Sequence, residues 1–217
     1  MIKADLHIHT GYSPDSATPL ERVIARCTER GINCVAITDH NTIAGALDMK
    51  RVAPFKVIVG EEIDTAQGEV IGYFLTDEIP RGLPADETVR RIKKQGGLVA
   101  VPHPFDSFRL SALRRDTLEE LVPHIDIIEV FNARLLLRRH ADRARAFADA
   151  HGLLASAGSD AHTASEVGNA YIEMPDFNDR NDFLSSLAQG TVVGRLSSPF
   201  VHLRSNWAKL GRAWKRD

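Results

Sequence analysis

The chain has 217 residues and a formal net charge of −2, with 43% hydrophobic and 26% charged residues. A chain of this size can bury one sizeable core, and its balanced charge gives no bulk attraction to nucleic acid or to a membrane surface. Only Cys27 and Cys34 are available, which argues against a secreted disulfide scaffold, and both are expected in the core. No apolar run reaches membrane-spanning length and the N-terminus has no signal-peptide pattern, so we expect a single-domain cytoplasmic protein.

Short apolar runs alternate with helical patterns along the chain. They predict strands buried on both faces of a parallel sheet, at Ile2–Leu6, Cys34–Ile37, Val57–Gly60, Val70–Leu75, Leu98–Val101, Ile125–Phe131 and Leu153–Ala157, with weaker candidates at Tyr171–Met174 and Thr191–Leu196. Repeated strand–helix units, about seven of them, predict an α/β barrel. Gln67 and Gly68 between two of the runs indicate a tight hairpin, so one connection is expected to be antiparallel.

Three of the helical patterns have recognisable ends. The first follows a capping box at Thr18–Glu21 and stops at Gly31. The second runs from about Pro84 to Gln95, with acids first and bases last, as the helix dipole favours. The third runs from about 135 to 150, and its inward face is expected to hold Leu137, Ala141, Ala144 and Ala148.

Histidines and acids of metal-ligand type stand where nearly every predicted strand ends. Asp5, His7 and His9 alternate, which places them on one face, and the later strands end near Asp39, His40, Glu61, Glu62, His103, Glu129, Asp160 and His162. In a barrel the carboxyl ends of the strands meet on one face, and converging nitrogen and oxygen ligands suit Zn, Mn or Fe. There are more such groups than one ion needs, so we predict a multinuclear site.

The structural alternative is that each histidine is an ordinary satisfied polar residue at a strand end. Burying several acids and imidazoles together without a cation would be costly, and this favours the metal site. The remaining histidines are interpreted as solvated residues of helices or loops: His124, His140, His151 and His202.

Taken together, these residues resemble the PHP (polymerase and histidinol phosphatase) family, in particular its short stand-alone metal-dependent phosphoesterases. The resemblance rests on the segments Asp5–Thr10, Ile37–Thr42, Gly60–Ile63, Val101–Pro104 and Gly158–His162. It implies a distorted (β/α)7 barrel over residues 1–200 and two or three divalent metal ions. Residues 201–217 would then form a basic tail, interpreted as a solvated helical extension rather than a nucleic-acid contact.

The resemblance also implies a ligand set for each metal. The first metal would be held by His7, His9, Glu62 and Asp160, the second by Glu62 and His103, and the third by Asp15, His40 and His162. Glu62, which would bridge metals, is expected to be catalytic together with Asp160 and His162. Several members carry a histidine on the fourth strand where this chain has Glu69, a harder ligand that favours Mn or Fe over Zn. The alternative for Glu69 is a role in the hairpin backbone only.

The chemistry implied is hydrolysis of a phosphate ester, of a small phosphorylated metabolite or a nucleotide, by a metal-bridging hydroxide. Arg109, Arg134 and Asn132 are expected to bind the phosphate, and the alternative for the arginines is pairing with an acid such as Asp106 or Asp116. The rival activities are a phosphomonoesterase acting on small metabolites, including histidinol phosphate, a 5′-end nuclease acting on short oligonucleotides, and a hydrolase of amides or lactones. A metal-binding role without catalysis is the non-enzymatic alternative.

Overall fold

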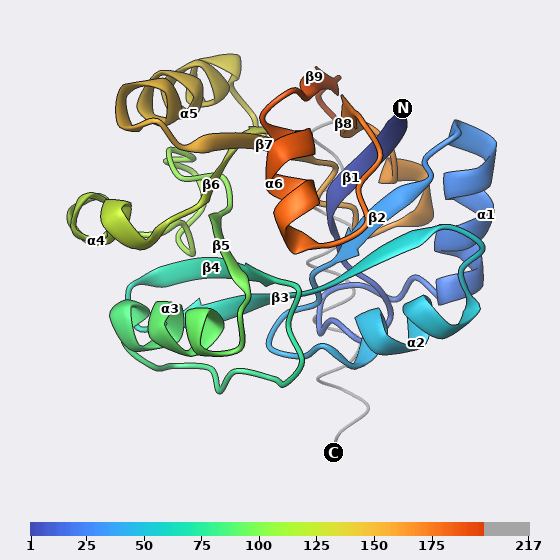
Figure 1. Ribbon diagram of the computed structural model, residues 1–217, viewed down its shortest axis with the longest axis horizontal. Coiled ribbons are helices and arrows are strands. Elements are labelled where there is room, and N and C mark those ends of the chain that lie inside the picture. The colour runs from blue at the N-terminus through green and yellow to red at the C-terminus, as the bar shows by residue number, and fades with distance from the viewer. Residues whose placement is uncertain (198–217) are drawn as a thin grey trace.

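The structure, a computed structural model, describes residues 1–197 (Figure 1). Within them, nine strands form one sheet in the order β7-β6-β5-β4-β3-β2-β1-β8-β9. The strands are β1 Ile2–Ile8, β2 Cys34–Ile37, β3 Lys56–Thr65, β4 Gly68–Tyr73, β5 Leu98–Val101, β6 Ile127–Asn132, β7 Leu154–Gly158, β8 Ala170–Met174 and β9 Thr191–Gly194. The helices are α1 Leu20–Arg30, α2 Ala44–Val52, α3 Ala85–Lys94, α4 Arg115–Leu121, α5 Arg138–His151 and α6 Arg180–Leu187, with 3-10 turns at Val122–His124 and Ala164–Glu166.

The first seven strands nearly close into a barrel. The end of β1 meets the segment after β7 through a bridge between Ile8 and Ala161, and the amide of Asp160 donates to the carbonyl of His7 at 2.8 Å. Strands β8 and β9 continue the sheet on the other side of β1. The predicted distorted (β/α)7 barrel is therefore confirmed, and the weaker strand candidates form this two-stranded extension.

Strand β4 distorts the barrel because it runs antiparallel to both of its neighbours. It is joined to β3 by the predicted hairpin at Gln67 and Gly68. Since β4 runs backwards, its first residues, and not its last, lie at the end of the barrel where the parallel strands finish. Glu69 thereby pairs with Asp64, two residues after Glu62 on the same face of β3.

Two apolar layers hold the barrel together. The inner one contains alternate strand residues such as Leu6 and Ile58, and it continues onto Phe183 of α6, which Figure 1 shows in front of the strands near the middle of the view. The outer one joins the other faces of the strands to α1–α5. Cys27 lies in the outer layer and Cys34 in the inner one, and both are buried free thiols, as predicted.

The ends of two helices differ from the prediction. Helix α1 stops at Gly31 in the left-handed conformation, as predicted, but the capping box at Thr18 is wrong. The Thr18 hydroxyl donates instead to the carbonyl of His162 at 2.9 Å, which ties the start of α1 to the loop after β7. Helix α5 begins only at Arg138, so Leu137 precedes it, whereas Ala141, Ala144 and Ala148 form its buried face as predicted.

Among residues 1–197, no helix is both long and apolar enough to cross a membrane. The basic segment 201–217 and His202 lie outside the described residues, and the interpretations given to them stay predictions.

The contact between β1 and β7 leaves no room for a side chain at Gly158. A Cβ built there would lie 2.3 Å from the Cβ of His7 and 2.7 Å from its backbone nitrogen. We expect Gly158→Ala to lower the free energy of unfolding by at least about 2 kcal/mol in urea denaturation, because overpacking must separate the strands. Gly11→Ala is the matched control, since its Cβ would lie 3.4 Å from the Thr18 carbonyl oxygen, an ordinary contact. Equal midpoints for the two variants would contradict this account of barrel closure.

Candidate metal centre

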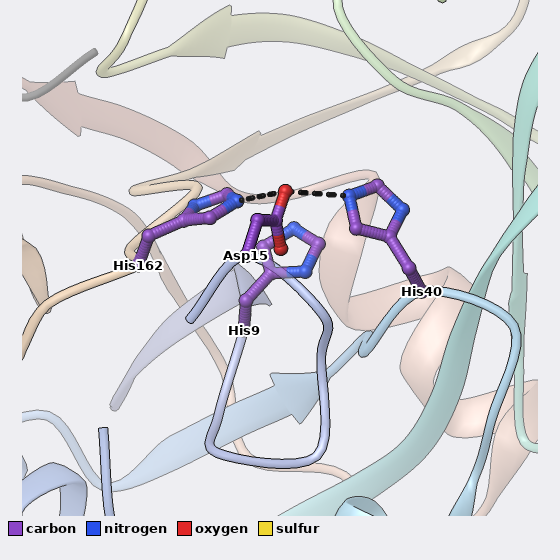
Figure 2. A group of neighbouring side chains, drawn as sticks. All are labelled: His9, Asp15, His40 and His162. Atoms are coloured by element: carbon purple, nitrogen blue, oxygen red, sulfur yellow. Dashed lines mark ion pairs between the residues drawn. The ribbon is translucent and has the colours of Figure 1, made fainter. Parts of the chain in front are cut away.

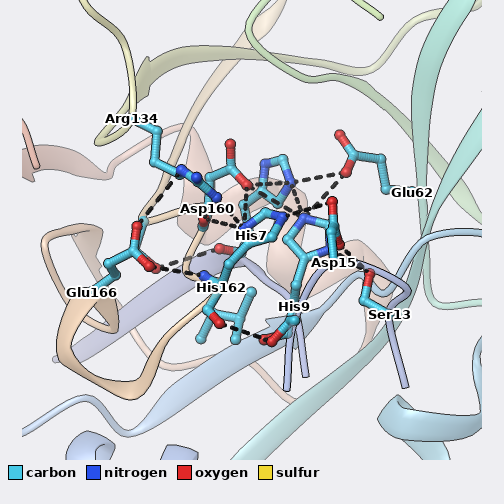
Figure 3. Close-up of polar contacts among 12 residues, drawn as sticks. His7, His9, Ser13, Asp15, Glu62, Arg134, Asp160, His162 and Glu166 are labelled. Atoms are coloured by element: carbon cyan, nitrogen blue, oxygen red, sulfur yellow. Dashed lines mark hydrogen bonds and ion pairs between the residues drawn. The ribbon is translucent and has the colours of Figure 1, made fainter. Parts of the chain in front are cut away.

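The predicted ligands all meet at one end of the barrel, around the ends of β1, β2, β3, β5 and β7 and the start of β4. They are His7, His9, Asp15, His40, Glu62, Glu69, His103, Asp160 and His162, and each contacts at least one other member. Figures 2 and 3 show how most of these side chains point toward one another. Every one except His40 is buried, and His40 is only slightly exposed. Sequence positions far apart in the chain therefore form one compact cluster.

Unusual backbone conformations at the strand ends aim two of these side chains. His103 and Asp160 have φ angles of 31° and 51°, in a region that residues other than glycine rarely adopt. Each is the second residue after the end of a strand, so the chain turns sharply there and directs the side chain into the barrel mouth. Such strain persists only where surrounding contacts hold it, and here the amide of His103 donates to Glu129 and that of Asp160 to His7.

The first ligand group comprises His7, His9, Glu62 and Asp160. The Nδ1 atom of His7 lies 3.0 Å from Glu129, and that of His9 lies 3.2 Å from Ser13. Each imidazole can therefore donate from Nδ1 and turn the lone pair of Nε2 toward the cluster, where the two Nε2 atoms are 3.1 Å apart. They lie 3.4 and 3.2 Å from Oε2 of Glu62, and 3.7 and 3.3 Å from Oδ1 of Asp160.

These distances fit a bound cation. Ligand atoms about 2.0–2.2 Å from one metal ion stand roughly 3–3.6 Å from each other, which is close to the 3.1–3.7 Å found here. Oε2 of Glu62 and Oδ1 of Asp160 are buried and accept no hydrogen bond from the described residues, so a cation would satisfy both. Burial by itself would lower the pKa of His7, but the carboxylates of Glu62, Glu129 and Asp160 outweigh it and raise this pKa well above the usual value. The group thus attracts positive charge.

The second group comprises Asp15 with His9, His40 and His162 (Figure 2). Oδ2 of Asp15 lies 3.2 Å from Nε2 of His162 and 3.4 Å from Nε2 of His40. Burial opposes the charge on Asp15, yet its contacts with the two histidines hold its pKa well below the usual range. Burial and the neighbouring His9 lower the pKa of His162 to about 4, so its imidazole is neutral at pH 7, the form that binds metals.

The third group brings Glu69 into the cluster. Nε2 of His103 lies 3.3 Å from Oε1 of Glu62 and 3.5 Å from Oε2 of Glu69, while Nδ1 of His40 lies 3.4 Å from Oε2 of Glu62. Oε2 of Glu69 is buried and accepts no hydrogen bond from residues 1–197. Burial and the nearby Glu62 raise the pKa of Glu69, which a cation between the two carboxylates would reverse. The side chain is turned to the cluster, whereas the Glu69 amide donates to the carbonyl of Ser111 in the loop after β5.

The grouping differs in detail from the sets that the family resemblance implies. His9 belongs to both of the first two groups, and His40 faces both Asp15 and Glu62 with its two nitrogens. Glu62 contributes to the first and third groups, so its carboxylate lies between them. The structure places these residues together, and the role of each as a ligand stays a prediction.

Four further acids of the strand-end pattern lie outside the three ligand groups. Asp5 accepts from the amides of Ser159 and Gly168, and Asp39 accepts from the amide and hydroxyl of Thr10. Although the alternation in β1 places Asp5 with the histidines, a register shift follows it, and it does not reach the ligand groups. The other two are Glu129, bound to His7, and Glu61, bound to the amide of Ile79.

The residues expected to bind phosphate also lie at the cluster. Arg109 Nη2 lies 2.8 Å from Oδ2 of Asp160, and Asn132 donates to the same oxygen at 3.2 Å. Arg134 is buried, with Nη1 against Nδ1 of His162 and Nε 3.6 Å from Glu166. Both arginines thus face acids, although Asp116 is not one of them, because it pairs with Arg114 on the surface. Phosphate binding by these three residues stays a prediction.

Three residues at or near the site were not foreseen. Ser13 is buried between His9 and Asp15, at 3.2 and 3.1 Å. Glu166 accepts from the amide of His162 and closes a capping box with Thr163, a pattern that the Thr-x-x-Glu spacing could have revealed. His140, predicted to be solvated, is instead buried against the loop after β5, so that prediction is wrong. His124 and His151 are exposed, as predicted.

Family comparisons agree with this geometry. The PHP domain profile matches residues 5–96, and the PHP-associated profile matches residues 138–192. Two uncharacterized proteins of Methanocaldococcus jannaschii are 41% identical over 145 residues, covering 61% of this chain and 82% of the relative, and 38% identical over 218 residues, covering 99% and 87%. This chain belongs to the PHP family. In this PHP protein, the residues of the predicted ligand motifs are the ones that meet at the end of the barrel.

Solved structures support the fold of this PHP protein. A two-domain protein of Bacteroides vulgatus, described as containing a predicted PHP-like metal-dependent phosphoesterase, superposes with a TM-score of 0.73 and 17% identity over 89% of this chain and 65% of its own. An amidohydrolase of Chromobacterium violaceum, with bound sulfate and no metal, gives 0.60 and 18% identity over 76% and 89%. At these identities the likeness establishes the barrel alone.

Substitution of Glu69 tests whether its carboxylate is a metal ligand in the third group. If its carboxylate holds a metal, Glu69→Ala should bind about one Mn fewer per chain than the parent protein, which we expect to bind at least two, in elemental analysis after Mn loading. Glu120→Ala is the matched control, because it removes a glutamate on the exposed surface of α4. The control should keep the parent stoichiometry. An unchanged Mn content in Glu69→Ala, with reduced stability, would assign Glu69 to the hairpin alone.

Proposed function

We propose that this PHP protein is a metal-dependent phosphoesterase that hydrolyses the phosphate ester of a small phosphorylated metabolite or a nucleotide. The observation that supports it most is the position of Glu62, whose two carboxylate oxygens face His7, His9, His40 and His103 from one buried point. A carboxylate surrounded in this way fits between two cations, which is the arrangement used to clamp a phosphoryl group. Family membership supports the same conclusion.

The donor set indicates which ions would fit. Imidazole nitrogens and carboxylate oxygens suit Zn, Mn and Fe, and both cysteines of the chain lie in the apolar layers, not in the cluster. The carboxylate of Glu69 in place of a histidine shifts the preference of the third group toward Mn or Fe. Two or three such ions, when bound, supply Lewis acidity that makes water nucleophilic at neutral pH and neutralises phosphoryl charge.

The chain's own residues supply orientation and positive charge. His7 and His9 are held by Glu129 and Ser13, so their rings cannot rotate away from the cluster without losing those partners. Arg109 is kept charged, because the carboxylates of Asp160, Glu69 and Glu62 overcome the effect of burial and raise its pKa. A guanidinium beside the ligands can bind a phosphoryl oxygen in a fixed direction.

A substrate panel tests the proposal. The Mn-loaded protein is assayed with p-nitrophenyl phosphate, histidinol phosphate, a nucleoside bisphosphate, a short RNA, and an amide or lactone. We expect turnover of at least one phosphate ester, lost on removing the metal with a chelator and regained on adding Mn. Cleavage of RNA from its 5′ end alone would assign the nuclease activity. Turnover of the amide or lactone alone would replace the phosphoesterase with a hydrolase of that class.

Glu62→Gln tests the residue on which the proposal rests. Replacing one carboxylate oxygen by an amide nitrogen removes a ligand and a charge between the cations, so we expect kcat/KM to fall by at least about a hundredfold. Glu61→Gln is the matched control on the same strand, because an amide oxygen can still accept the bond from the amide of Ile79. It should change kcat/KM by less than about threefold. Turnover of Glu62→Gln close to that of this control would remove Glu62 from the mechanism.

A further inference from the structure

The loop between β5 and α4 carries Arg109 to the metal centre, and it is built around Asp106. The Asp106 amide donates to the carbonyl of His103, and the Arg109 amide donates to the carbonyl of Asp106, each at 3.1 Å. The Asp106 carboxylate is buried, and its Oδ1 accepts from the amide of Phe108 at 3.1 Å. Its Oδ2 lies 3.7 Å from Nε of Arg109, so one acid organises both the turn and the arginine.

A single side chain from α5 holds this loop from the other side. His140, in the first turn of α5, is buried, and its Nδ1 lies 3.5 Å from Oδ1 of Asp106. Its Nε2 lies 3.4 Å from the hydroxyl of Ser107, and its ring lies 5.9 Å from that of Phe108. His140 therefore contacts three successive residues of the loop, immediately before Arg109.

The opposite end of Arg109, together with Asn132, holds one oxygen of Asp160. Nη2 of Arg109 lies 2.8 Å from Oδ2 of Asp160, while Oδ1 is the oxygen turned toward His7 and His9. The tip of the loop gives Arg109 little support, since Leu110 is fully exposed and Phe108 is 59% exposed. The contacts through Asp106 and His140 are thus the buried ones that can keep the guanidinium in place.

We propose that Asp106 and His140 are positioning residues that hold Arg109 against Asp160 and thereby fix the oxygen that Asp160 offers to a metal. The contact of Asp106 with Arg109, at 3.7 Å, is a charge contact rather than a hydrogen bond, so we expect the carboxylate of Asp106 to be needed for it, while Nδ1 of His140 lies 3.5 Å from the other oxygen of the same carboxylate. Partners of this kind beyond the ligands commonly change metal affinity 10–100-fold. The proposal rests on the metal centre of the proposed function, but it does not depend on the substrate.

The test measures Mn affinity by calorimetric titration of the metal-free, full-length protein. Arg109→Ala should weaken Mn binding by roughly 10–100-fold. Asp106→Asn removes the charge but keeps an oxygen for the amide of Phe108, and we expect it to weaken Mn binding about tenfold. When both changes are combined, Asp106→Asn should cause no further loss, because its effect passes through Arg109. Arg115→Ala, on the exposed surface of α4, is the control for removing an arginine.

Substitutions of His140 test the first of the contacts that run from His140 through Asp106 and Arg109 to Asp160. His140→Phe fills similar space without the ring nitrogens and should weaken Mn binding as Asp106→Asn does. His140→Asn places an amide near the former Nδ1 and should restore part of the affinity. His124→Phe, at an exposed histidine, should leave the affinity unchanged. Thermal unfolding of each metal-free variant verifies that it is folded before the titration.

Two results would overturn the proposal. One is an Mn affinity in Asp106→Asn equal to that of the parent, and the other is a loss that adds in full to that of Arg109→Ala. Failure of the phosphoesterase proposal gives a different result, because a parent protein that turns over no phosphate ester would still show this pattern of Mn affinities.

Discussion

The whole structure is arranged around one electrostatic constraint: carboxylates and imidazoles that would repel or remain unsatisfied by themselves are kept out of water together. One carboxylate oxygen each of Glu62, Glu69 and Asp160 is buried without a hydrogen-bond partner among the described residues. Cations in the space between these side chains would satisfy these oxygens and offset the cost of burying the carboxylates. The barrel provides the rigid frame for this, since the ligands come from the ends of strands whose apolar layers fix their positions.

Beyond the ligands, the frame is completed by acids that bind backbone amides. Asp5 holds the segments after β7 through Ser159 and Gly168, and Asp39 holds the loop that follows β1 through Thr10. Each of these loops carries predicted ligands. Asp5 and Asp39 therefore help to position the cluster, although neither side chain belongs to a ligand group. Closure of β1 against the end of β7 then brings His7 and Asp160 together.

The sequence predicted the parts of this design that local patterns encode. Strand-end histidines such as His7 and His103 follow apolar runs and were predicted from that pattern. Asp15 and Glu69 were predicted to be ligands only through the resemblance to the family. Patterns fail where a side chain serves a distant partner. Thr18 caps no helix because its hydroxyl meets a carbonyl 144 residues away, and His140 is buried by a loop that precedes it by more than 30 residues. The spacing of residues along the chain cannot predict such contacts between distant segments.

The reversed direction of β4 has a consequence for how this centre can change in evolution. Glu62 and Glu69 face the cluster from the two arms of one hairpin, in a register fixed by the pairing of Asp64 with Glu69. Side chains alternate along a strand, so a single inserted or deleted residue in the turn would rotate the fourth-strand ligand to the outer face. The residue at position 69 can therefore be exchanged without moving the hairpin, while the length of the turn must stay constant. A substitution at position 69 would thus change the donor atom offered to the cluster without changing the number of residues in the hairpin.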